Sequence, residues 1–528
     1  MTRSRSVSTT LERIAPFSNE PVKKFADPQE VAEMQAALAR VKARFGERYP
    51  LVIGGRRIET EKQIISRNPA HKSEIVGSVS SASAAQASEA IEIAAATFES
   101  WKRMSFERRA EVLFRAAALM RERRYEYDAL LVYEVGKNWA EAEGETTEAI
   151  DFLEYYAREA LRYGSEQPVV PFPGERNELR YIPLGVGAVI PPWNFALAIL
   201  VGMTSAALVT GNTVVLKPSS DSPVIAARVV ELFEEAGLPA GALNFIPGSG
   251  SEIGDLIVGH AKTRFISFTG SKEVGLHINE RAAKTAPGQK WIKRVVAEMG
   301  GKDSIVVAAD ADLDAAVEGV AISAFGFTGQ KCSACSRAIV EASIYDAFVE
   351  RLKARVAKIT VGDPALPGTG MGPVVSENAF KSISKYIEVG KGEGRLLCGG
   401  SPIGDEGYFL EPTVIVDVAP DARISCEEIF GPVLSVHKAR DFEHALEIAN
   451  NTEFGLTGSL YTTDRAKIER AREDFFVGNL YFNRKSTGAL VGVHPFGGFN
   501  MSGTDSKAGG RDYLLLFLQA KSISEKLG

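Results

Sequence analysis

The sequence predicts an α/β protein with two doubly wound lobes and a small separate β element, and three observations support this prediction. From about Arg180, short β-rich runs alternate with helix-like segments, which is the pattern of a parallel sheet covered by helices. After Glu298 the same alternation begins a second time. The chain has 528 residues, 45% of them hydrophobic, so it can bury more than one core. We therefore expect two Rossmann-like lobes.

The composition excludes several classes of function. The net charge of −6 is spread over mixed signs, so no nucleic-acid surface is expected. Gly, Pro or charged residues interrupt the apolar runs before they reach the ~20 residues of a membrane span. Four cysteines in a chain of this length indicate a reducing compartment, and we expect a cytoplasmic protein.

The first part of the chain reads as largely helical. Met1–Pro16 is interpreted as a mobile tail, with a weak organellar presequence as the alternative. Asp27-Pro28 starts a helix that Gly46 ends, and residues 51–58 form a hairpin around Gly54-Gly55. Three further helices are expected at 83–101, 105–124 and 139–163. The third carries acidic residues that are expected to form mostly a solvated face: Glu141, Glu143, Glu145, Glu148 and Asp151.

Repeated strand–helix units then define the first lobe. Strands are expected at 187–190, 213–216, 243–246 and 265–268. The helices that follow them are expected at 197–209, 223–236, 251–258 and 271–283. Ligands of parallel sheets bind at the carboxyl ends of the strands, so the turns after these strands are candidate sites.

The second lobe starts with a strand and an apolar helix that lead into a loop. Its expected elements are a strand at 304–307, helix 313–325, strand 336–340, helix 346–358, a mixed stretch 394–431, strand 434–437, helix 443–450 and strand 460–461. A β-rich hairpin at 168–182 and a strand-like tail at 513–523 are expected to form the small third element.

Cys332 lies between the helix 313–325 and the following strand, in a loop of small residues between the two lobes. A thiolate there could be reached by a substrate and stabilised by backbone N–H groups. One alternative is a small buried cysteine. Another is a redox or zinc pair with Cys335, but no second CxxC or His cluster completes such a site, so we expect no metal.

Evidence for a dinucleotide from the residues alone is weak. No GxGxxG is present, because the run from Gly248 to Gly254 has one residue too many. Two strand-to-helix turns, 247–251 and 269–271, contain small residues and free helix N-termini that suit a pyrophosphate. Two turns without a function are an equally good interpretation. Lys217, at the end of a strand, could bind ribose hydroxyls or be solvated.

Six motifs nevertheless occur in the order found in one superfamily. They are Pro192-Trp193-Asn194-Phe195, Leu216-Lys217-Pro218-Ser219, Phe268-Thr269-Gly270-Ser271, Glu298-Met299-Gly300-Gly301-Lys302, Gly329-Gln330-Lys331-Cys332 and Glu428-Ile429-Phe430-Gly431-Pro432. From about Leu51 to its end the chain resembles the aldehyde dehydrogenases. Three stretches are similar to one branch, the stand-alone bacterial Δ1-pyrroline-5-carboxylate dehydrogenases: Phe17–Pro21, Gly329–Ala334 and Asn483–Gly498.

The chemistry of aldehyde oxidation gives roles to three of these residues. An aldehyde is a poor hydride donor, whereas its thiohemiacetal is a good one, so Cys332 is the candidate nucleophile. The resemblance assigns the oxyanion donors to the side chain of Asn194 and the backbone N–H of Cys332. Glu298 is the candidate general base that hydrolyses the resulting thioester. Without the resemblance, Asn194 reads as a turn residue and Glu298 as a solvated acid.

The resemblance also implies sites for cofactor and substrate. The cofactor-binding candidates are Pro192, Trp193, Lys217, Ser219, Ser220, Gly248, Gly270, Ser271, Gly300, Glu428 and Phe430. NAD is expected, but NADP stays an alternative, because Ser220 stands where many NAD-preferring members have a Glu that repels a 2′-phosphate. The substrate-binding candidates are Glu148, Phe195, Ser333, Gly488, Ala489 and Phe496. Of these, Glu148 reads almost as well as a solvated helix residue, and no role is assigned to Lys331.

The expected reaction is the NAD-dependent oxidation of L-glutamate γ-semialdehyde to L-glutamate in proline degradation. The alternatives are an enzyme for another short semialdehyde and a catalytically silent structural protein on the same fold. The expected domains are an N-terminal arm and helix (1–46), an NAD-binding domain (47–163 and 183–297), a catalytic domain (298–500) and an oligomerisation flap (164–182 and 501–528). We expect a homodimer or an assembly of dimers, with transient contact to a separate proline dehydrogenase.

Overall fold

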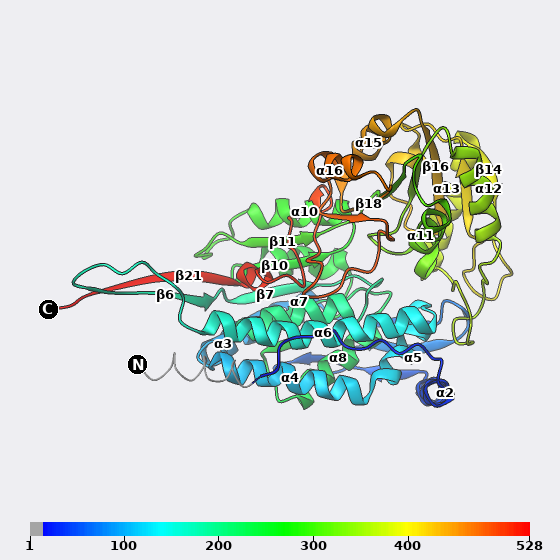
Figure 1. Cartoon of the computed structure of the whole chain (residues 1–528). Coiled ribbons are helices and arrows are strands. Elements are labelled where there is room, and N and C mark those ends of the chain that lie inside the picture. Colours follow the sequence, from blue (N-terminus) through cyan, green and yellow to red (C-terminus); the bar gives the residue numbers. More distant parts are fainter. Residues whose placement is uncertain (1–13) are drawn as a thin grey trace.

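The computed structural model describes residues 14–528, so nearly all of the stretch interpreted as a mobile tail lies outside the described residues. Two seven-stranded sheets form two lobes, which Figure 1 shows one above the other, with a narrow ribbon projecting from the lower lobe. The predicted α/β architecture with two mainly parallel sheets is confirmed. Within the described residues, no helix is both long enough and apolar enough to cross a membrane.

The first lobe is built on a sheet with the order β11-β10-β7-β8-β9-β2-β3. The strands are β11 (Arg294–Glu298), β10 (Thr263–Thr269), β7 (Val186–Ile190), β8 (Thr213–Leu216), β9 (Leu243–Phe245), β2 (Leu51–Ile53) and β3 (Arg56–Ile58). The five strands from β11 to β9 run parallel, and the predicted β2–β3 hairpin adds an antiparallel edge. All four strands predicted for the strand–helix units are present.

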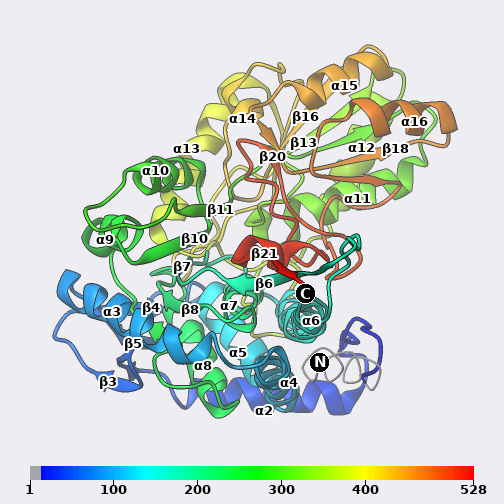
Figure 2. The ribbon, with the colours of Figure 1, turned by 90° about the vertical axis from the view of Figure 1, so that its left-hand side faces the viewer.

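Helices cover both faces of this sheet, as the two views in Figures 1 and 2 show. They are α2 (Pro28–Lys42), α3 (Ala84–Trp101), α4 (Phe106–Glu122), α5 (Arg124–Val135), α6 (Trp139–Gly164), α7 (Ala198–Val209), α8 (Pro223–Glu235), α9 (Asp255–Gly259) and α10 (Lys272–Ala283). A small sheet of β1 (Glu47–Tyr49), β5 (Ile75–Ser80) and β4 (Gln63–Arg67) lies beside them. The helix predicted at 251–258 begins as a π-helical turn, Gly250–Gly254. Helix α5 was not predicted.

The second lobe has the sheet order β14-β15-β16-β13-β12-β18-β19, with only β14 antiparallel. The strands are β14 (Arg395–Cys398), β15 (Thr413–Val416), β16 (Val433–Ala439), β13 (Arg337–Glu341), β12 (Ser304–Val307), β18 (Thr457–Tyr461) and β19 (Asn479–Phe482). The helices are α11 (Leu313–Phe325), α12 (Tyr345–Val356), α13 (Glu377–Glu393), α14 (Arg423–Cys426), α15 (Phe442–Asn450) and α16 (Arg465–Asp474). Of these, α13 and α16 were not predicted.

The chain crosses between the lobes at two neighbouring places. It leaves the first lobe after β11, through residues 299–303, and returns near residue 502, after β20 (Phe499–Asn500) has paired with β17 (Phe454–Gly455) of the second lobe. The backbone N–H of Met299 donates to the carbonyl of Ser502 at 2.7 Å, so the two crossings are hydrogen-bonded to each other.

The projecting ribbon corrects one prediction. Residues 168–182 do not form a hairpin, because the single strand β6 (Glu175–Pro183) pairs antiparallel with the C-terminal strand β21 (Leu518–Lys526). The first part of the predicted tail strand is instead a 3₁₀ helix, Tyr513–Phe517, whose Leu514 and Phe517 side chains are fully buried in the first lobe.

The acidic residues of α6 correct a second prediction, that of a mostly solvated helix face. Glu143, Glu145 and Asp151 are at most 3% exposed, so the expectation of a mostly solvated face is wrong. Helix α6 packs against α4, α5 and α7, which removes these three side chains from the outer surface. The carboxylates of this face instead bind buried cations and backbone N–H groups. Glu143, for example, accepts hydrogen bonds from the side chain of Arg124 and from the backbone N–H of Lys23.

Candidate active site

The Cys332 loop is a tight, strained turn at the predicted helix-to-strand junction. After α11 the chain forms a 3₁₀ turn, Gly326–Gly329, in which Phe327 and Thr328 have positive φ angles of 48° and 58°. Positive φ is unfavourable for residues with a β-carbon, and such strain concentrates at functional sites. At Gly329 a β-carbon would lie 2.2 Å from the carbonyl oxygen of Gly431, so only glycine fits there. The turn fixes the course of the chain into Cys332.

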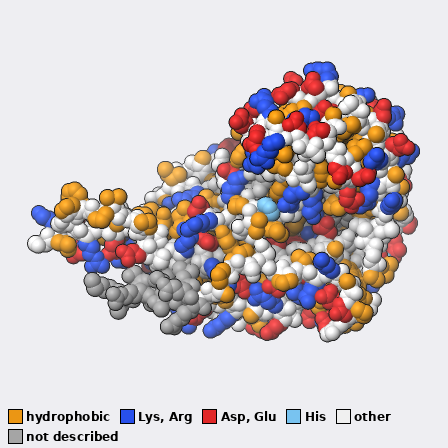
Figure 3. Space-filling view, viewed as in Figure 1, with side chains coloured by type: hydrophobic (Ala, Val, Ile, Leu, Met, Phe, Trp, Pro, Cys, Tyr) orange, Lys and Arg blue, Asp and Glu red, His pale blue; other side chains and the backbone are white. Residues whose placement is uncertain are grey.

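A cavity of about 420 Å³ opens beside this loop. Its walls come from α6, α7, the ends of β10 and β11, the Cys332 loop and residues 485–491. Figure 3 shows a hollow between the two lobes on the face that it presents. The structure brings eight predicted residues to the wall of this cavity: Glu148, Phe195, Glu298, Cys332, Ser333, Gly488, Ala489 and Phe496.

Glu298, at the end of β11, is held by three hydrogen bonds. Its Oε1 accepts from the hydroxyl of Ser506 at 2.7 Å and from the backbone N–H of the same residue at 3.2 Å, and its Oε2 accepts from the N–H of Gly498 at 3.1 Å. Burial raises the pKa of this carboxyl to about 7, although the hydrogen bonds oppose the rise. A carboxyl that titrates near neutrality can act as a general base.

The thiol of Cys332 is favoured over the thiolate in this structure. Burial raises its pKa, and the nearby carboxylates of Asp303, Glu428 and Glu298 raise it further, while the backbone N–H of Ser333 opposes them. The backbone N–H of Ser333 favours the thiolate, as expected, but burial and the neighbouring carboxylates act more strongly in the opposite direction. The Cys332 proton needs an acceptor in the cavity before the sulfur can attack.

Asn194 lies next to the Cys332 loop. Its side chain is buried, and its Nδ2 donates to the carbonyl of Gln330 at 3.1 Å. The segment around Asn194 is fixed by Glu145, whose Oε1 accepts from the N–H groups of Leu197 and Ala198 at 2.7 and 3.1 Å. Gln330 precedes Cys332 by two residues. The Asn194 amide therefore contacts the part of the loop that leads directly to the sulfur.

A buried ion pair joins the Asn194 segment to the Cys332 loop. Lys137 and Glu145 are both fully buried in side chain, with Nζ 2.6 Å from Oε2. The same Nζ lies 4.2 Å from the ring centre of Phe195 and 4.3 Å from that of Phe327, so one cation contacts both segments.

The loop 485–491 forms the far wall of the cavity. Nη2 of Arg484 donates to the carbonyls of Thr487 and Gly488 at 3.0 and 3.1 Å. Among the described residues, no hydrogen bond occupies the N–H group of Gly488 or Ala489. Two N–H groups at the wall of a cavity are suitable donors for a carboxylate.

Three charged side chains lie around this end of the cavity. Lys331, to which no role was assigned, pairs with Glu141 at 2.6 Å. The third is Lys485, whose pKa is lowered by burial and by the charge of Lys331. Nearby on α6, Glu148 lines the cavity and is therefore not an ordinary solvated helix residue. Burial and the charge of Glu145 raise the pKa of its carboxyl to about 8.

The predicted cofactor residues lie along the carboxyl ends of the first-lobe strands and across the gap to residues 428–430. The rings of Trp193, next to Pro192, and Phe430 meet edge to face, with centres 5.6 Å apart. A β-carbon on Gly300 would lie 2.2 Å from the Glu428 carboxylate. The missing side chain at residue 300 therefore lets the Glu428 carboxylate lie against the backbone. Oε1 of Glu428 accepts from the N–H of Gly301 at 3.0 Å.

The remaining cofactor candidates are small residues and one lysine. Lys217 is 9% exposed and its Nζ contacts the carbonyl of Pro218 at 3.3 Å. The Ser271 hydroxyl caps α10 by accepting from the N–H of Val274 at 3.4 Å. The others occupy turns or strand ends: Ser219, Ser220, Gly248 and Gly270. A β-carbon on Gly248 or Gly270 would meet the side chains of nearby residues at 2.6 Å.

Comparison with known proteins identifies the family. The model of the aldehyde dehydrogenase family matches residues 57–523. The chain belongs to the aldehyde dehydrogenase family. A curated relative from Geobacillus kaustophilus, named 1-pyrroline-5-carboxylate dehydrogenase, is 57% identical over 512 residues, which cover 97% of this chain and 99% of the relative.

Two solved structures show how far the likeness extends. Thermus 1-pyrroline-5-carboxylate dehydrogenase with bound NAD is 52% identical, with a TM-score of 0.96, and the match covers 97% of this chain and 99% of that one. Proline utilization A from Bdellovibrio bacteriovorus is 45% identical, with a TM-score of 0.95, but this aldehyde dehydrogenase covers only 53% of that chain. The resemblance inferred from the ordered motifs is confirmed.

The residues of this aldehyde dehydrogenase fit the dinucleotide that such enzymes use. Lys217 is a buried cation that forms no ion pair with the described carboxylates, so it can donate to ribose hydroxyls. Among the described residues, no hydrogen bond occupies Oε2 of Glu428, which leaves an acceptor for a ribose diol. The rings of Trp193 and Phe430 add an apolar contact beside it. These donors, acceptors and rings suit NAD.

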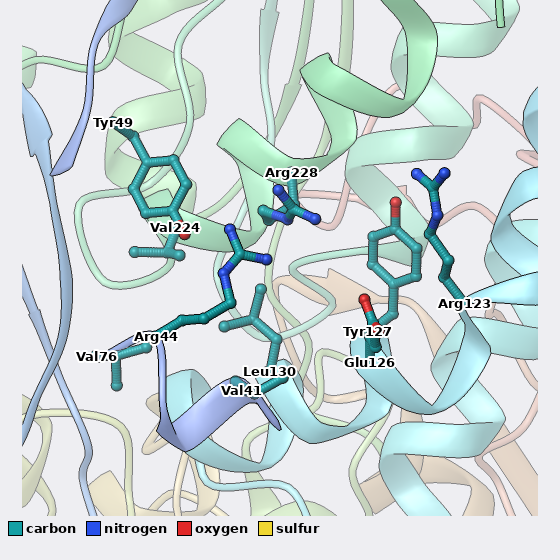
Figure 4. A pocket seen from close by; sticks show the side chains of 10 residues that line it. All are labelled: Val41, Arg44, Tyr49, Val76, Arg123, Glu126, Tyr127, Leu130, Val224 and Arg228. Atoms are coloured by element: carbon teal, nitrogen blue, oxygen red, sulfur yellow. The ribbon is translucent and has the colours of Figure 1, made fainter. Parts of the chain in front are cut away.

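A second, much smaller cavity lies between α2, α5 and α8 (Figure 4). Three arginines line it, but each is paired with a carboxylate: Arg44 with Glu47, Arg123 with Glu235 and Arg228 with Glu231. Its volume of about 30 Å³ suits about one water molecule. The paired charges and the small volume give this cavity no features of a ligand site.

Proposed function

We propose that this aldehyde dehydrogenase oxidises L-glutamate γ-semialdehyde, which is in equilibrium with Δ1-pyrroline-5-carboxylate, to L-glutamate with NAD. The observation that carries the proposal is the cavity itself. Cys332 and Glu298 lie at its wall together with the N–H groups of Gly488 and Ala489, which suit the carboxylate of a semialdehyde. The high identity to proteins named 1-pyrroline-5-carboxylate dehydrogenase supports the same substrate.

In the proposed mechanism Cys332 adds to the aldehyde carbon. The thiol proton passes to Glu298, whose pKa of about 7 makes it an acceptor at neutral pH. The carbonyl oxygen becomes an alkoxide, which the Asn194 amide and the backbone N–H of Cys332 stabilise. Nδ2 of Asn194 carries two hydrogens, so one can stay with the carbonyl of Gln330 while the other donates to the alkoxide.

The second half of the reaction releases the acid. The chemistry that NAD supplies when bound is acceptance of the hydride, which leaves a thioester on Cys332. Glu298 returns its proton to solvent and then takes a proton from water, which attacks the thioester carbon. The Cys332 sulfur leaves as a thiolate and takes the proton of the product acid, which restores the thiol and frees the carboxylate, and Glu298 again returns its proton to solvent. Lys217, Glu428, Trp193 and Phe430 would hold the dinucleotide.

The proposed substrate contacts follow its charges. The α-carboxylate accepts from the N–H groups of Gly488 and Ala489 and from the hydroxyl of Ser333. The α-ammonium group faces the carboxyl of Glu148, whose pKa the ammonium lowers, so that Glu148 ionises when the substrate is bound. Phe195 and Phe496 pack against the methylene chain.

The assignment of regions and partners is part of the same proposal. Residues 47–163 with 183–297 would bind NAD, 298–500 would carry the chemistry, and 164–182 with 501–528 would form an oligomerisation flap. The projecting ribbon supports a homodimer or an assembly of dimers, and the cysteine content supports a cytoplasmic location. The match to part of proline utilization A supports transient contact with a separate proline dehydrogenase.

The deciding experiment measures NADH formation with Δ1-pyrroline-5-carboxylate, succinate semialdehyde and propanal, each with NAD and with NADP. We expect kcat/KM to be highest for Δ1-pyrroline-5-carboxylate with NAD. Equal or better values for the other aldehydes would keep the mechanism and reject the substrate. Cys332→Ala should abolish oxidation but keep NAD binding, because the sulfur forms the bond to the substrate, and no activity in the wild type with any aldehyde would favour a silent structural protein.

A further inference from the structure

The N-terminal segment 14–25 lies along α6 and reaches the wall of the active-site cavity. In Figure 1 it is the dark blue stretch that crosses α6 before α2 begins. Arg158 on α6 donates to the carbonyl of Ala15 at 3.0 Å, and Glu143 accepts from the N–H of Lys23 at 2.8 Å. Asn19, Glu20 and Val22 line the cavity. We call residues 14–25 the strap.

Asn19 connects α6 to the loop 485–491. Its Nδ2 donates to Oδ2 of Asp151 on α6 at 2.8 Å and to the carbonyl of Val491 at 2.9 Å. The other oxygen of Asp151 accepts from the N–H of Glu20 at 2.7 Å. Asp151 on α6 therefore holds the strap at two neighbouring residues, Asn19 and Glu20. One amide group thus spans the helix and the loop.

A ring contact adds a second attachment between the strap and this loop. A β-carbon on Gly492, which has a φ of +76°, would lie 3.1 Å from both the Phe17 ring and the Tyr155 ring. The Phe17 and Tyr155 rings themselves meet edge to face with centres 5.0 Å apart. The chain at 491–492 is therefore held by the bond from Asn19, by an aromatic wall and by a backbone bond from the N–H of Gly492 to the carbonyl of Gly509 at 2.8 Å.

The loop that is held in this way carries the free N–H groups of Gly488 and Ala489. A carboxylate gains from backbone donors only when they are fixed before it binds, because ordering a loop costs conformational entropy. The carbonyls of Thr487 and Gly488 are already fixed by Arg484 on one side of the loop. Asn19 fixes the other side, at Val491.

We propose that Asn19 is a positioning residue that determines specificity, because it holds the loop 485–491 in the form that binds the carboxylate of the substrate. This inference rests on the proposed function. Asn19 acts through the loop, so its loss should affect carboxylated aldehydes and spare plain ones. It also gives a role to the stretch Phe17–Pro21, which is otherwise distant from the chemistry in sequence.

The test compares Asn19→Ala with Ser18→Ala, an exposed neighbour on the same strap. For Δ1-pyrroline-5-carboxylate we expect the KM of Asn19→Ala to rise about 10-fold, the effect of one or two lost hydrogen bonds. Its kcat, and its KM for propanal, should stay within about twofold of wild type. Ser18→Ala should match wild type, and Asn19→Gln, which keeps the amide, should recover part of the loss.

An equal rise in KM for both aldehydes, or no rise for either, would overturn the inference while leaving the proposed function intact. If the wild type shows no preference for Δ1-pyrroline-5-carboxylate over propanal, the proposed function fails, and the inference fails with it. Hydrogen–deuterium exchange supplies a readout that needs no substrate. The backbone of 485–492 should exchange faster in Asn19→Ala, and in Phe17→Leu as a second variant, than in Ser18→Ala, and unchanged exchange in both would contradict the proposed positioning.

Discussion

Glu298 illustrates how single residues set the chemistry of this site. Burial and hydrogen bonding act on its carboxyl in opposite directions, and burial is the larger effect. The hydroxyl of Ser506 donates to the ionised form, so it limits the rise in pKa. Ser506 could not be found from the sequence, because it follows no motif and is far from Glu298 along the chain.

The first prediction concerns the pH dependence of kcat under conditions where thioester hydrolysis limits the rate. With a pKa of about 7, Glu298 is protonated below that pH and cannot accept a proton, so kcat should fall as pH drops through 7. Ser506→Ala removes a donor that favours the carboxylate, so the pKa of Glu298 should rise. The acid limb of the curve of kcat against pH should then move up by about 0.5–1 pH unit. Thr504→Val is the control, because its hydroxyl contacts the backbone of Ala297 and not the carboxylate. A limb that stays in place in Ser506→Ala would contradict this account.

The second prediction concerns Gly300. A β-carbon there would collide with the Glu428 carboxylate at 2.2 Å, so Gly300→Ala must displace it. We expect the KM for NAD to rise about 10-fold, because the proposed ribose acceptor moves by more than a hydrogen bond tolerates. Gly392→Ala is a matched control, since no atom lies within 4 Å of its β-carbon position. Equal NAD titrations for the two variants would show that Glu428 does not bind the ribose.

At the scale of elements, the buried pair Lys137–Glu145 joins α6, the start of α7 and the Cys332 loop. Removing one partner of a buried pair leaves the other charge uncompensated, which typically costs about 3–5 kcal/mol. Lys137→Met should therefore lower the free energy of unfolding by about that amount, measured by urea denaturation. It should also lower kcat, because Glu145 no longer fixes the segment that carries Asn194.

The double variant Lys137→Met with Glu145→Gln separates the two effects. Without the charge on residue 145, most of the lost stability should return, since a buried pair is often no more stable than its neutral replacement. The low kcat should persist in part, because a neutral amide oxygen is a weaker acceptor than a carboxylate for the N–H groups of Leu197 and Ala198. A double variant as unstable as the single one would show that packing, and not the charge, causes the loss.

Local patterns predicted the elements that depend on local chemistry. The strand–helix units and the Cys332 junction are visible because apolar runs and small residues mark them. Helix α5 was not predicted, because it follows α4 after a single non-helical residue, Arg123, and begins without a capping side chain. The solvated face expected for α6 was wrong because its partners, Lys137 and Arg124, lie outside the helix.

Long-range pairings could not be predicted from local patterns. Strand β6 pairs with β21, which lies at the C-terminal end of the described chain. Because the sequence around β6 does not reveal this distant partner, residues 168–182 were predicted to form a hairpin by themselves. The resemblance supplied every predicted residue on the cavity wall. It also included the stretch Phe17–Pro21, but it gave no role to Asn19, and Ser506 lies in no quoted motif, so the contacts of these two residues were not predicted. Sequence reasoning thus reached the residues proposed for the chemistry and missed those that hold them.

For the whole molecule, the ribbon of β6 and β21 projects away from both lobes, as Figures 1 and 3 show. In the segment that leads into β6, the side chains of Val170 and Phe172 are 88% and 63% exposed, so two large apolar groups close together in the chain face solvent. If the ribbon forms the proposed subunit contact, Val170→Asp with Phe172→Asp should convert the assembly into smaller species, measured by light scattering. An unchanged molar mass would place the contact elsewhere.

The two crossings between the lobes have a mechanical consequence. Residues 299–303 and the returning chain at 502 are hydrogen-bonded side by side, and Glu298 is the residue immediately before the first crossing. The lobes also meet elsewhere, where Nδ2 of Asn138 donates to the carbonyl of Gly370 at 2.9 Å and Nε1 of Trp139 donates to the carbonyl of Ala365 at 3.2 Å. Attachments at separate places oppose rotation of one lobe against the other. The position of Glu298 relative to the Cys332 loop is therefore held by more than the covalent connection beside it.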